Sequence, residues 1–146
     1  MRVVVISGYF NPIHTGHIDY INAASDMGDK LVVIVNYDKQ VSITGSTPFM
    51  EEVQSMSIVN SSKGVNKTVL SIDIDGAVTE TLKLIYDEYS VDYFFDSMVF
   101  ANGGDRTKGN SPEEEYCNWR GIRTAYNVGG KKTQSSSELL KREQDA

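Results

Sequence analysis

Residues 2–28 of the chain are RVVVISGYFNPIHTGHIDYINAASDMG. The apolar, β-branched run from Arg2 to Ser7 predicts a buried strand, because a strand covered on both faces does not alternate polar and apolar residues. A loop with glycine and polar residues follows, and His17 to Met27 predicts a helix that Gly28 closes. This order of strand, loop and helix is typical of an α/β domain with a mainly parallel sheet.

The rest of the chain continues to alternate strand-length apolar runs with helical segments. Further strands are expected at residues 31–35 and 68–72, within 91–101, and at 126–128. Further helices are expected after Pro48, at 78–89, from 112 to about 125, and at 135–142. Ser111 and Pro112 have the residue types of a helix N-cap and first helical position. We expect one domain over residues 1–142 and a frayed terminus at 143–146.

Some conspicuous side chains are expected to belong to the core. Tyr93-Phe94-Phe95 is interpreted as the centre of the fourth strand. Tyr116, Trp119 and Ile122 are spaced three apart and are expected to pack on the sheet. Cys117 is expected to be a buried or half-buried thiol.

Composition excludes several classes of function. The 146 residues carry 14 basic and 20 acidic side chains, a net charge of −6, which counts against duplex DNA as a partner. A single cysteine, Cys117, excludes an intramolecular disulfide, and the N-terminus shows no secretion signal. No segment approaches the roughly 18 apolar residues of a membrane helix. We therefore expect a cytoplasmic domain that binds neither nucleic acid nor membrane.

Both histidines of the chain, His14 and His17, lie in the loop and helix start after the first strand. Ligands of open parallel sheets bind beyond the carboxyl ends of the strands, which is where this loop lies. Two imidazoles three residues apart add donors to helix N-terminal amides that already favour an anion. The pattern therefore predicts a phosphate-binding loop.

Two alternatives remain for this histidine pair. A zinc site would need further ligands, and beyond the two histidines only Cys117 and carboxylates remain to supply them. The second alternative is that both histidines are ordinary loop residues without a ligand.

The loop carries the pattern G-x-F-x-x-x-H-x-G-H, formed by Gly8, Phe10, His14, Gly16 and His17. This pattern resembles the signature of the cytidylyltransferase-like nucleotidyltransferases, the group that contains glycerol-3-phosphate cytidylyltransferase and heptose-1-phosphate adenylyltransferase. The likeness extends along the chain through Asn36-Tyr37-Asp38, Gly103-Gly104-Asp105 and Ser135-Ser136-Ser137. The resemblance implies a single doubly wound, Rossmann-like α/β domain with a five-stranded, mainly parallel sheet of order 3-2-1-4-5 and helices on both faces.

The resemblance also implies an activity. Members transfer CMP from CTP, or AMP from ATP, to a small phosphorylated acceptor such as glycerol 3-phosphate or a sugar phosphate, and release pyrophosphate. Mg²⁺ would be held mainly by the nucleotide phosphates rather than by a protein metal site. A homodimer is expected as well.

Specific residues receive roles from the resemblance. The expected catalytic residues are His14, His17 and Lys39. The expected nucleotide-binding residues are Gly8, Tyr9, Phe10, Gly16, Gly103, Gly104, Asp105, Arg106, Ser135, Ser136 and Ser137. Taken singly, the segment around Gly104 is also compatible with a plain turn, and the three serines with a helix cap and linker.

The chain departs from the family pattern where phosphate-directed cations are usual. Thr44 and Gln54 stand about where a lysine and an arginine are expected, and Lys39 is the nearest base on that loop. Lys131 and Lys132 precede the serines in place of an arginine. An alternative function is therefore a catalytically weakened nucleotide-binding module of the same fold. A structural protein that binds no nucleotide is a third possibility.

Overall fold

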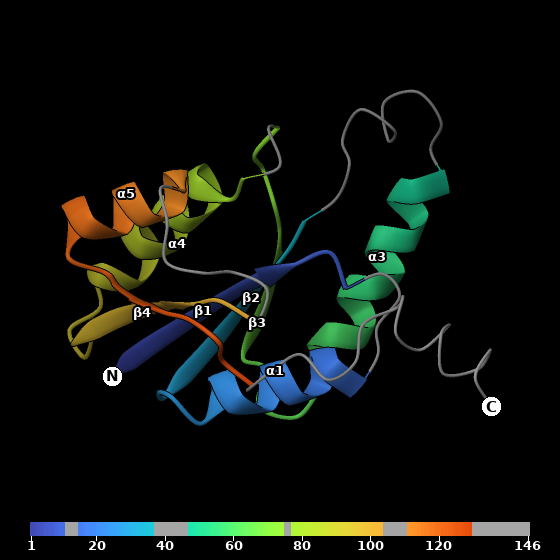
Figure 1. Cartoon of the computed structure of the whole chain (residues 1–146), viewed down its shortest axis with the longest axis horizontal. Coiled ribbons are helices and arrows are strands. Elements are labelled where there is room, and N and C mark those ends of the chain that lie inside the picture. Colours follow the sequence, from blue (N-terminus) through green and yellow to red (C-terminus); the bar gives the residue numbers. More distant parts are fainter. Residues whose placement is uncertain (11–14, 37–46, 75–76, 104–110, 130–146) are drawn as a thin grey trace.

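The computed structural model describes residues 1–10, 15–36, 47–74, 77–103 and 111–129 (Figure 1). Its elements, in chain order, are β1 (Arg2–Gly8), α1 (Thr15–Ser25), β2 (Lys30–Val35), α3 (Thr47–Asn60), β3 (Lys67–Leu70), α4 (Thr79–Ser90), β4 (Ser97–Ala101), α5 (Pro112–Arg120) and β5 (Arg123–Ala125). The helix expected at 135–142 and the terminus at 143–146 lie outside the described residues.

The strands form one parallel sheet in the order β3-β2-β1-β4-β5. Strand β1 is central, and its Val4 pairs with Leu31 of β2 on one side and with Val99 of β4 on the other. The order implied by the sequence resemblance is thereby confirmed, and every strand pairing in the described sheet is parallel. The fold class is the expected doubly wound α/β domain.

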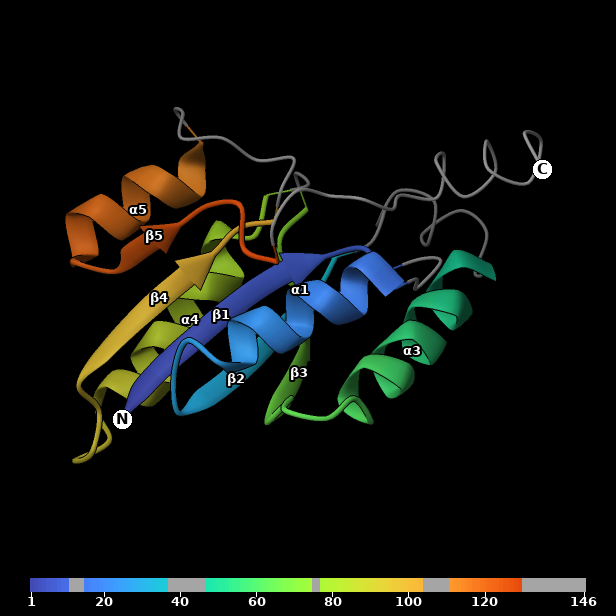
Figure 2. The ribbon, with the colours of Figure 1, turned by 60° about the horizontal axis from the view of Figure 1, so that its bottom comes forward.

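Helices cover both faces of this sheet (Figure 2). Val4 and Ile6 of β1 belong to the core shared with α1 and α3, whereas Val3 and Val5 belong to the core shared with α4 and α5. These four side chains have no exposed surface. Burial on both faces explains why the sequence of β1 shows a continuous apolar run rather than alternation.

The order of connections creates a switch point beside β1. From β1 the chain passes through α1 to β2 and on to β3, and after α4 it returns to β4 on the other side of β1. Connections that leave neighbouring strands in opposite directions open a crevice at their carboxyl ends, where ligands of such sheets bind. The fold therefore predicts a ligand site at the carboxyl ends of β1 and β4.

The last helix and strand that the structure describes do not have the predicted bounds. The Ser111 hydroxyl oxygen accepts a hydrogen bond from the Glu114 N–H at 3.1 Å, which confirms the predicted N-cap. However, α5 ends at Arg120 because Gly121 adopts a left-handed backbone with φ 79°. The prediction of a helix to about Ala125 and a strand at 126–128 was wrong, since β5 already occupies 123–125.

Two aromatic predictions were also wrong. Tyr93 and Phe94 precede β4 in a turn, and 92% and 71% of their surfaces are exposed. Trp119 lies on the outer side of α5 and is 75% exposed. The prediction for Cys117 and Ile122 was confirmed, because both are buried against the sheet.

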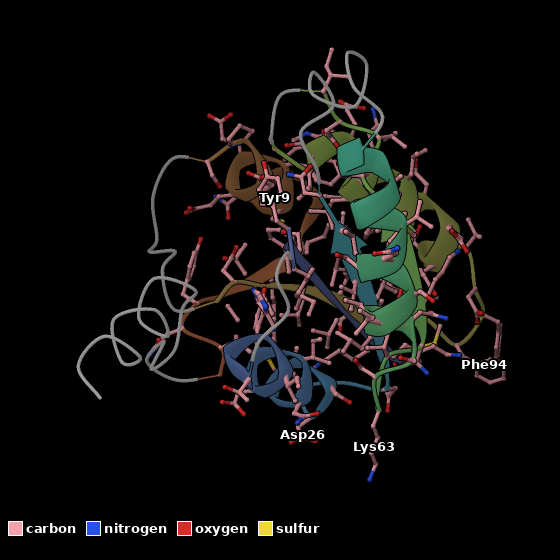
Figure 3. The ribbon with its side chains drawn as sticks, turned by 90° about the vertical axis from the view of Figure 1, so that its right-hand side faces the viewer. Tyr9, Asp26, Lys63 and Phe94 are labelled. Carbon is pink, nitrogen blue, oxygen red and sulfur yellow. The ribbon has the colours of Figure 1, made fainter. Side chains whose placement is uncertain are left out.

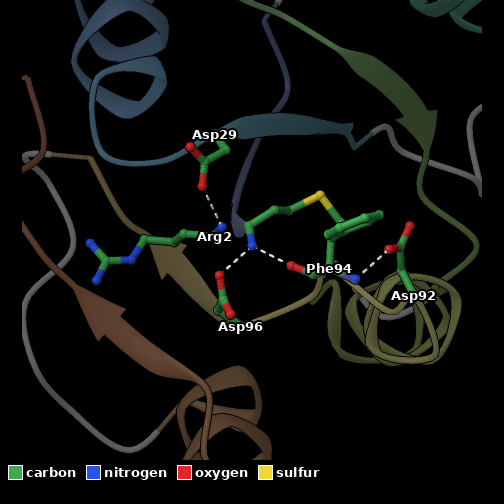
Figure 4. Close-up of polar contacts among 6 residues, drawn as sticks. Arg2, Asp29, Asp92, Phe94 and Asp96 are labelled. Atoms are coloured by element: carbon green, nitrogen blue, oxygen red, sulfur yellow. Dashed lines mark hydrogen bonds and ion pairs between the residues drawn. The ribbon is translucent and has the colours of Figure 1, made fainter.

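At the amino ends of β1, β2 and β4, acidic side chains bind backbone and N-terminal nitrogen atoms (Figure 4). The Asp29 carboxylate accepts from the Arg2 N–H at 2.7 Å, and the Asp96 carboxylate binds the ammonium group of Met1. A hollow of about 450 Å³ opens there. Its lining residues are Arg2, Asp26, Met27, Gly28, Asp29, Asp96 and Ser97. Three carboxylates against one guanidinium and one ammonium group make this edge a poor place for a phosphate, and it lies at the opposite end of the strands from the switch point.

Candidate functional site

The predicted site residues fall into two groups. Gly8, Tyr9, Phe10, Gly16, His17 and Gly103 are described by the structure. Those outside the described residues are His14, Lys39, Gly104, Asp105, Arg106, Ser135, Ser136 and Ser137. The residues of the first group all lie at the carboxyl ends of β1 and β4 or at the start of α1, so the structure brings them to the switch point.

The centre of the site is a packed unit of Gly8, Phe10 and His17. Phe10 is 1% exposed, and its ring meets the His17 imidazole in an edge-to-face contact with 5.1 Å between ring centroids. A Cβ on Gly8 would lie 3.1 Å from two carbons of the Phe10 ring, closer than ordinary contacts. Glycine at 8 therefore leaves the room in which Phe10 reaches His17.

The backbone of Phe10 is unusual for an aromatic residue. Its φ is 52°, in the left-handed region that costs an L-residue roughly 1–2 kcal/mol. The side chain of the neighbouring Tyr9 is 51% exposed (Figure 3). Burial of the Phe10 ring offsets the backbone cost, so the left-handed turn at Phe10 and the His17 contact stabilise each other.

Helix α1 begins beside this turn. Gly16 and His17 are in its first turn, where amide N–H groups lack acceptors within the helix and the helix dipole is positive. The His17 ring is half-buried. An imidazole and a set of helix N-terminal amides at one place suit an anion.

The N-terminus of α4 is different, because the chain's own carboxylates occupy it. Asp73 accepts hydrogen bonds from the Glu80 N–H at 2.9 Å, and from the N–H and hydroxyl of Thr81 at 2.9 and 2.6 Å. Glu113 accepts from the Val78 N–H at 3.0 Å. Both carboxylates are buried. A phosphate is therefore not expected at this helix.

Buried asparagines follow two of the strands. Asn36 follows β2 and donates its N–H to the Gly8 carbonyl at 2.8 Å. Asn102 follows β4, donates its N–H and side-chain amide to the Ala125 carbonyl, and accepts from the Val128 N–H. These bonds fix the strand ends relative to one another. Sequence reasoning named Asn36 but missed Asn102, although both directly follow an apolar run.

Sequence reasoning also missed Tyr20. Its hydroxyl donates a hydrogen bond to the carbonyl of Ala101, the last residue of β4. Tyr20 lies three residues after His17 and therefore on the same side of α1. This spacing was the available signal, but the contact with β4 depends on the tertiary fold.

The thiol of Cys117 takes no part in this site. Burial, with smaller contributions from Glu113 and Glu114, raises its pKa to about 12. A thiol in that state is not a nucleophile near neutral pH.

Within the described ranges, no three His, Cys, Asp or Glu side chains gather as ligands for a metal ion. None of the described helices is long and apolar enough to cross a bilayer.

Comparisons with known proteins identify the family of this chain. The model of the family described as cytidylyltransferase-like matches residues 5–144. An FAD synthase of Thermoplasma acidophilum is 33% identical over 72 residues, which cover 49% of this chain and 51% of that protein. An ethanolamine-phosphate cytidylyltransferase of Arabidopsis thaliana is 31% identical over 106 residues, or 70% and 25% of the two chains. This chain thus spans about half the length of the first relative and a quarter of the second.

A solved structure shares the fold. The lipopolysaccharide core biosynthesis protein from Thermoplasma volcanium superposes with a TM-score of 0.59 and 24% identity, covering 86% of this chain and 93% of that one. At this identity the likeness concerns the fold alone.

Proposed function

Because the chain belongs to the cytidylyltransferase-like family, we propose that it is a nucleotidyltransferase that moves CMP from CTP, or AMP from ATP, to a small phosphorylated acceptor. Pyrophosphate is the second product. The observation that supports this best is the packed unit of Gly8, Phe10 and His17 at the start of α1, beside the switch point. It combines a ring donor with helix N-terminal amides where a triphosphate would fit.

In the proposed reaction, an oxygen of the acceptor phosphate attacks the α-phosphorus of the nucleotide. The bond from that phosphorus to the bridging oxygen of pyrophosphate breaks, and negative charge grows on the oxygens. His17 and the first amides of α1 would stabilise this charge. Catalysis would therefore consist of positioning and charge stabilisation, without a covalent enzyme intermediate. The buried, protonated Cys117 fits this scheme.

Mg²⁺ would be held by phosphate oxygens and water, as its hard and strongly hydrated character favours. His14, Lys39, Arg106 and the serines at 135–137 would complete the phosphate contacts. Gly103, Gly104 and Asp105 would flank the base and ribose. A glycerol phosphate or a sugar phosphate is the proposed class of acceptor. A homodimer in the cytoplasm is part of the same proposal, and light scattering of the purified protein tests its oligomeric state.

The test follows pyrophosphate release from CTP or ATP with Mg²⁺ and a panel of phosphorylated acceptors. His17→Asn should lower turnover at least about a hundredfold, the usual effect of removing one transition-state donor. Asn22→Ala is the matched control, since Asn22 is exposed on the same helix. Wild-type turnover in His17→Asn, or silence of the native protein across the panel at high concentration, would contradict the proposal.

A catalytically weakened nucleotide-binding module is the second candidate. Gln54 on α3 and Thr44 stand where the family pattern favours cations, and Gln54 is exposed. Calorimetry separates the two functions. Tight nucleotide binding without turnover, unchanged in the double variant Thr44→Lys and Gln54→Arg, would favour the binding module.

A further inference from the structure

Tyr20 joins helix α1 to two other segments of the site. Its ring is half-buried among the apolar side chains between α1 and the sheet. Its hydroxyl donates to the carbonyl of Ala101 at the end of β4. His17 is one helical turn before it, on the same side of the helix. One side chain thus links the helix that carries the histidine to the strand on the far side of the switch point.

Two glycines pack directly on this tyrosine. A Cβ on Gly103 would lie 3.9 Å from three carbons of the Tyr20 ring. A Cβ on Gly129 would lie 3.1 Å from the Tyr20 Cα and 3.3 Å from its backbone nitrogen. In Figure 1 the orange segment after β5 accordingly runs to the side of α1. The segments after β4 and after β5 therefore both meet α1 at the same residue.

The segments that meet at Tyr20 are also tied to each other. The Val128 N–H donates to the Asn102 carbonyl at 3.0 Å, and the Asn102 N–H donates to the Ala125 carbonyl at 2.8 Å. These bonds hold the two segments together, and Tyr20 connects them to α1. In the sequence, Gly103 immediately precedes the residues proposed to contact the nucleotide at 104–106, and Gly129 lies six positions before Ser135.

We infer that Tyr20 is a positioning residue that sets the distance between the triphosphate-binding end of α1 and the segment after β4 at Gly103, which is proposed to flank the base and ribose. This inference rests on the proposed function. A nucleoside triphosphate would contact both the α1 side and the β4 side of the switch point, so its affinity depends on the distance between them. The affinity of a ligand that contacts the α1 side alone does not depend on this distance.

The test compares a whole ligand with a fragment of it. Tyr20→Phe keeps the ring on Gly103 and removes the hydroxyl that donates to the Ala101 carbonyl. We expect it to weaken binding of CTP or ATP, measured by calorimetry with Mg²⁺, about three- to tenfold, as the loss of one hydrogen bond does. Binding of inorganic tripolyphosphate should change less than twofold. In turnover assays KM for the nucleotide should rise by the same factor as the dissociation constant.

Tyr86→Phe is the matched control. Tyr86 lies on α4, on the opposite face of the sheet, where its ring contacts Phe95 and Arg120. This control should bind both ligands as the native protein does.

Three results would overturn the inference. Equal weakening for the nucleotide and tripolyphosphate would assign Tyr20 a general structural role. Unchanged nucleotide binding in Tyr20→Phe would show that the hydroxyl does not set the distance between α1 and the end of β4. Failure of the native protein to bind either nucleotide would instead refute the proposed function, and the positioning role with it.

Discussion

The contact between Phe10 and His17 predicts a specific division between stability and activity. Phe10→Leu removes the aromatic edge from the imidazole while keeping most of the buried volume of a side chain that is 1% exposed. A volume-conserving core substitution costs less than about 1.5 kcal/mol, and the lost ring contact adds about 0.5–1.5 kcal/mol. The free energy of unfolding should therefore fall by about 0.5–3 kcal/mol. Native domains have free energies of unfolding of about 5–15 kcal/mol, so the variant should stay folded.

The same ring contact sets the expected effect on activity. If about 0.5–1.5 kcal/mol holds the His17 imidazole in its native orientation, losing it lowers the ratio of that orientation to all others about 2- to 12-fold. Turnover by pyrophosphate release should fall by up to that factor at saturating nucleotide. Urea unfolding measures the stability of the same preparations.

Phe100→Leu is the control for this prediction. Phe100 is also 1% exposed, but it belongs to the core between the sheet and α4 and α5. Its substitution should lower stability by a similar amount and leave turnover unchanged. If Phe10→Leu loses stability but turns over as fast as Phe100→Leu, the Phe10 ring does not orient His17, and the reasoning is refuted.

Two further predictions concern a tight backbone contact and a buried thiol. Gly129→Ala should destabilise more than Gly121→Ala in urea, because both glycines have positive φ but only a Cβ at 129 meets the α1 backbone, at 3.1 Å from the Tyr20 Cα; equal losses would show that the contact yields without cost. The Cys117 pKa is about 12 in the folded chain against 9.0 for an ordinary thiol, so the unfolded state loses its proton first, and stability should decline as pH rises from 9 to 12. Denaturation at several pH values checks this, and an equally steep decline in Cys117→Ala would assign it to other groups.

Much of the fold could be predicted because local signals agreed with the tertiary structure. The apolar run before Gly8 needs two covered faces, and Ser111 followed by Pro112 starts a helix wherever the segment lies. The end of α5 was mispredicted because the apolar spacing of Trp119 and Ile122 outweighed the stop signal of Gly121. Aromatic β propensity likewise outweighed the turn before β4, in which the Asp92 carboxylate accepts from the Phe94 N–H at 2.8 Å.

The candidate site was predictable only where it is local in sequence. Gly8, Phe10 and His17 lie within ten residues of one another, so a motif contains them all. Tyr20 and Ala101 are 81 positions apart, and no pattern within either segment indicates that they meet. The left-handed backbone of Phe10 was not predicted either, since an aromatic residue rarely adopts it without tertiary packing.

The pairing of β1 with β4 has a kinetic consequence. These central neighbours are far apart in the sequence, and the pairing of Val4 with Val99 closes a loop of about 95 residues. Such long-range closure is slow, because the chain loses entropy before the contact rewards it. The crevice is built on this pairing, so ligand-binding competence should appear in the last phase of refolding. A partly folded chain with only β1, α1 and β2 in place would hold the histidine motif and still lack a binding site.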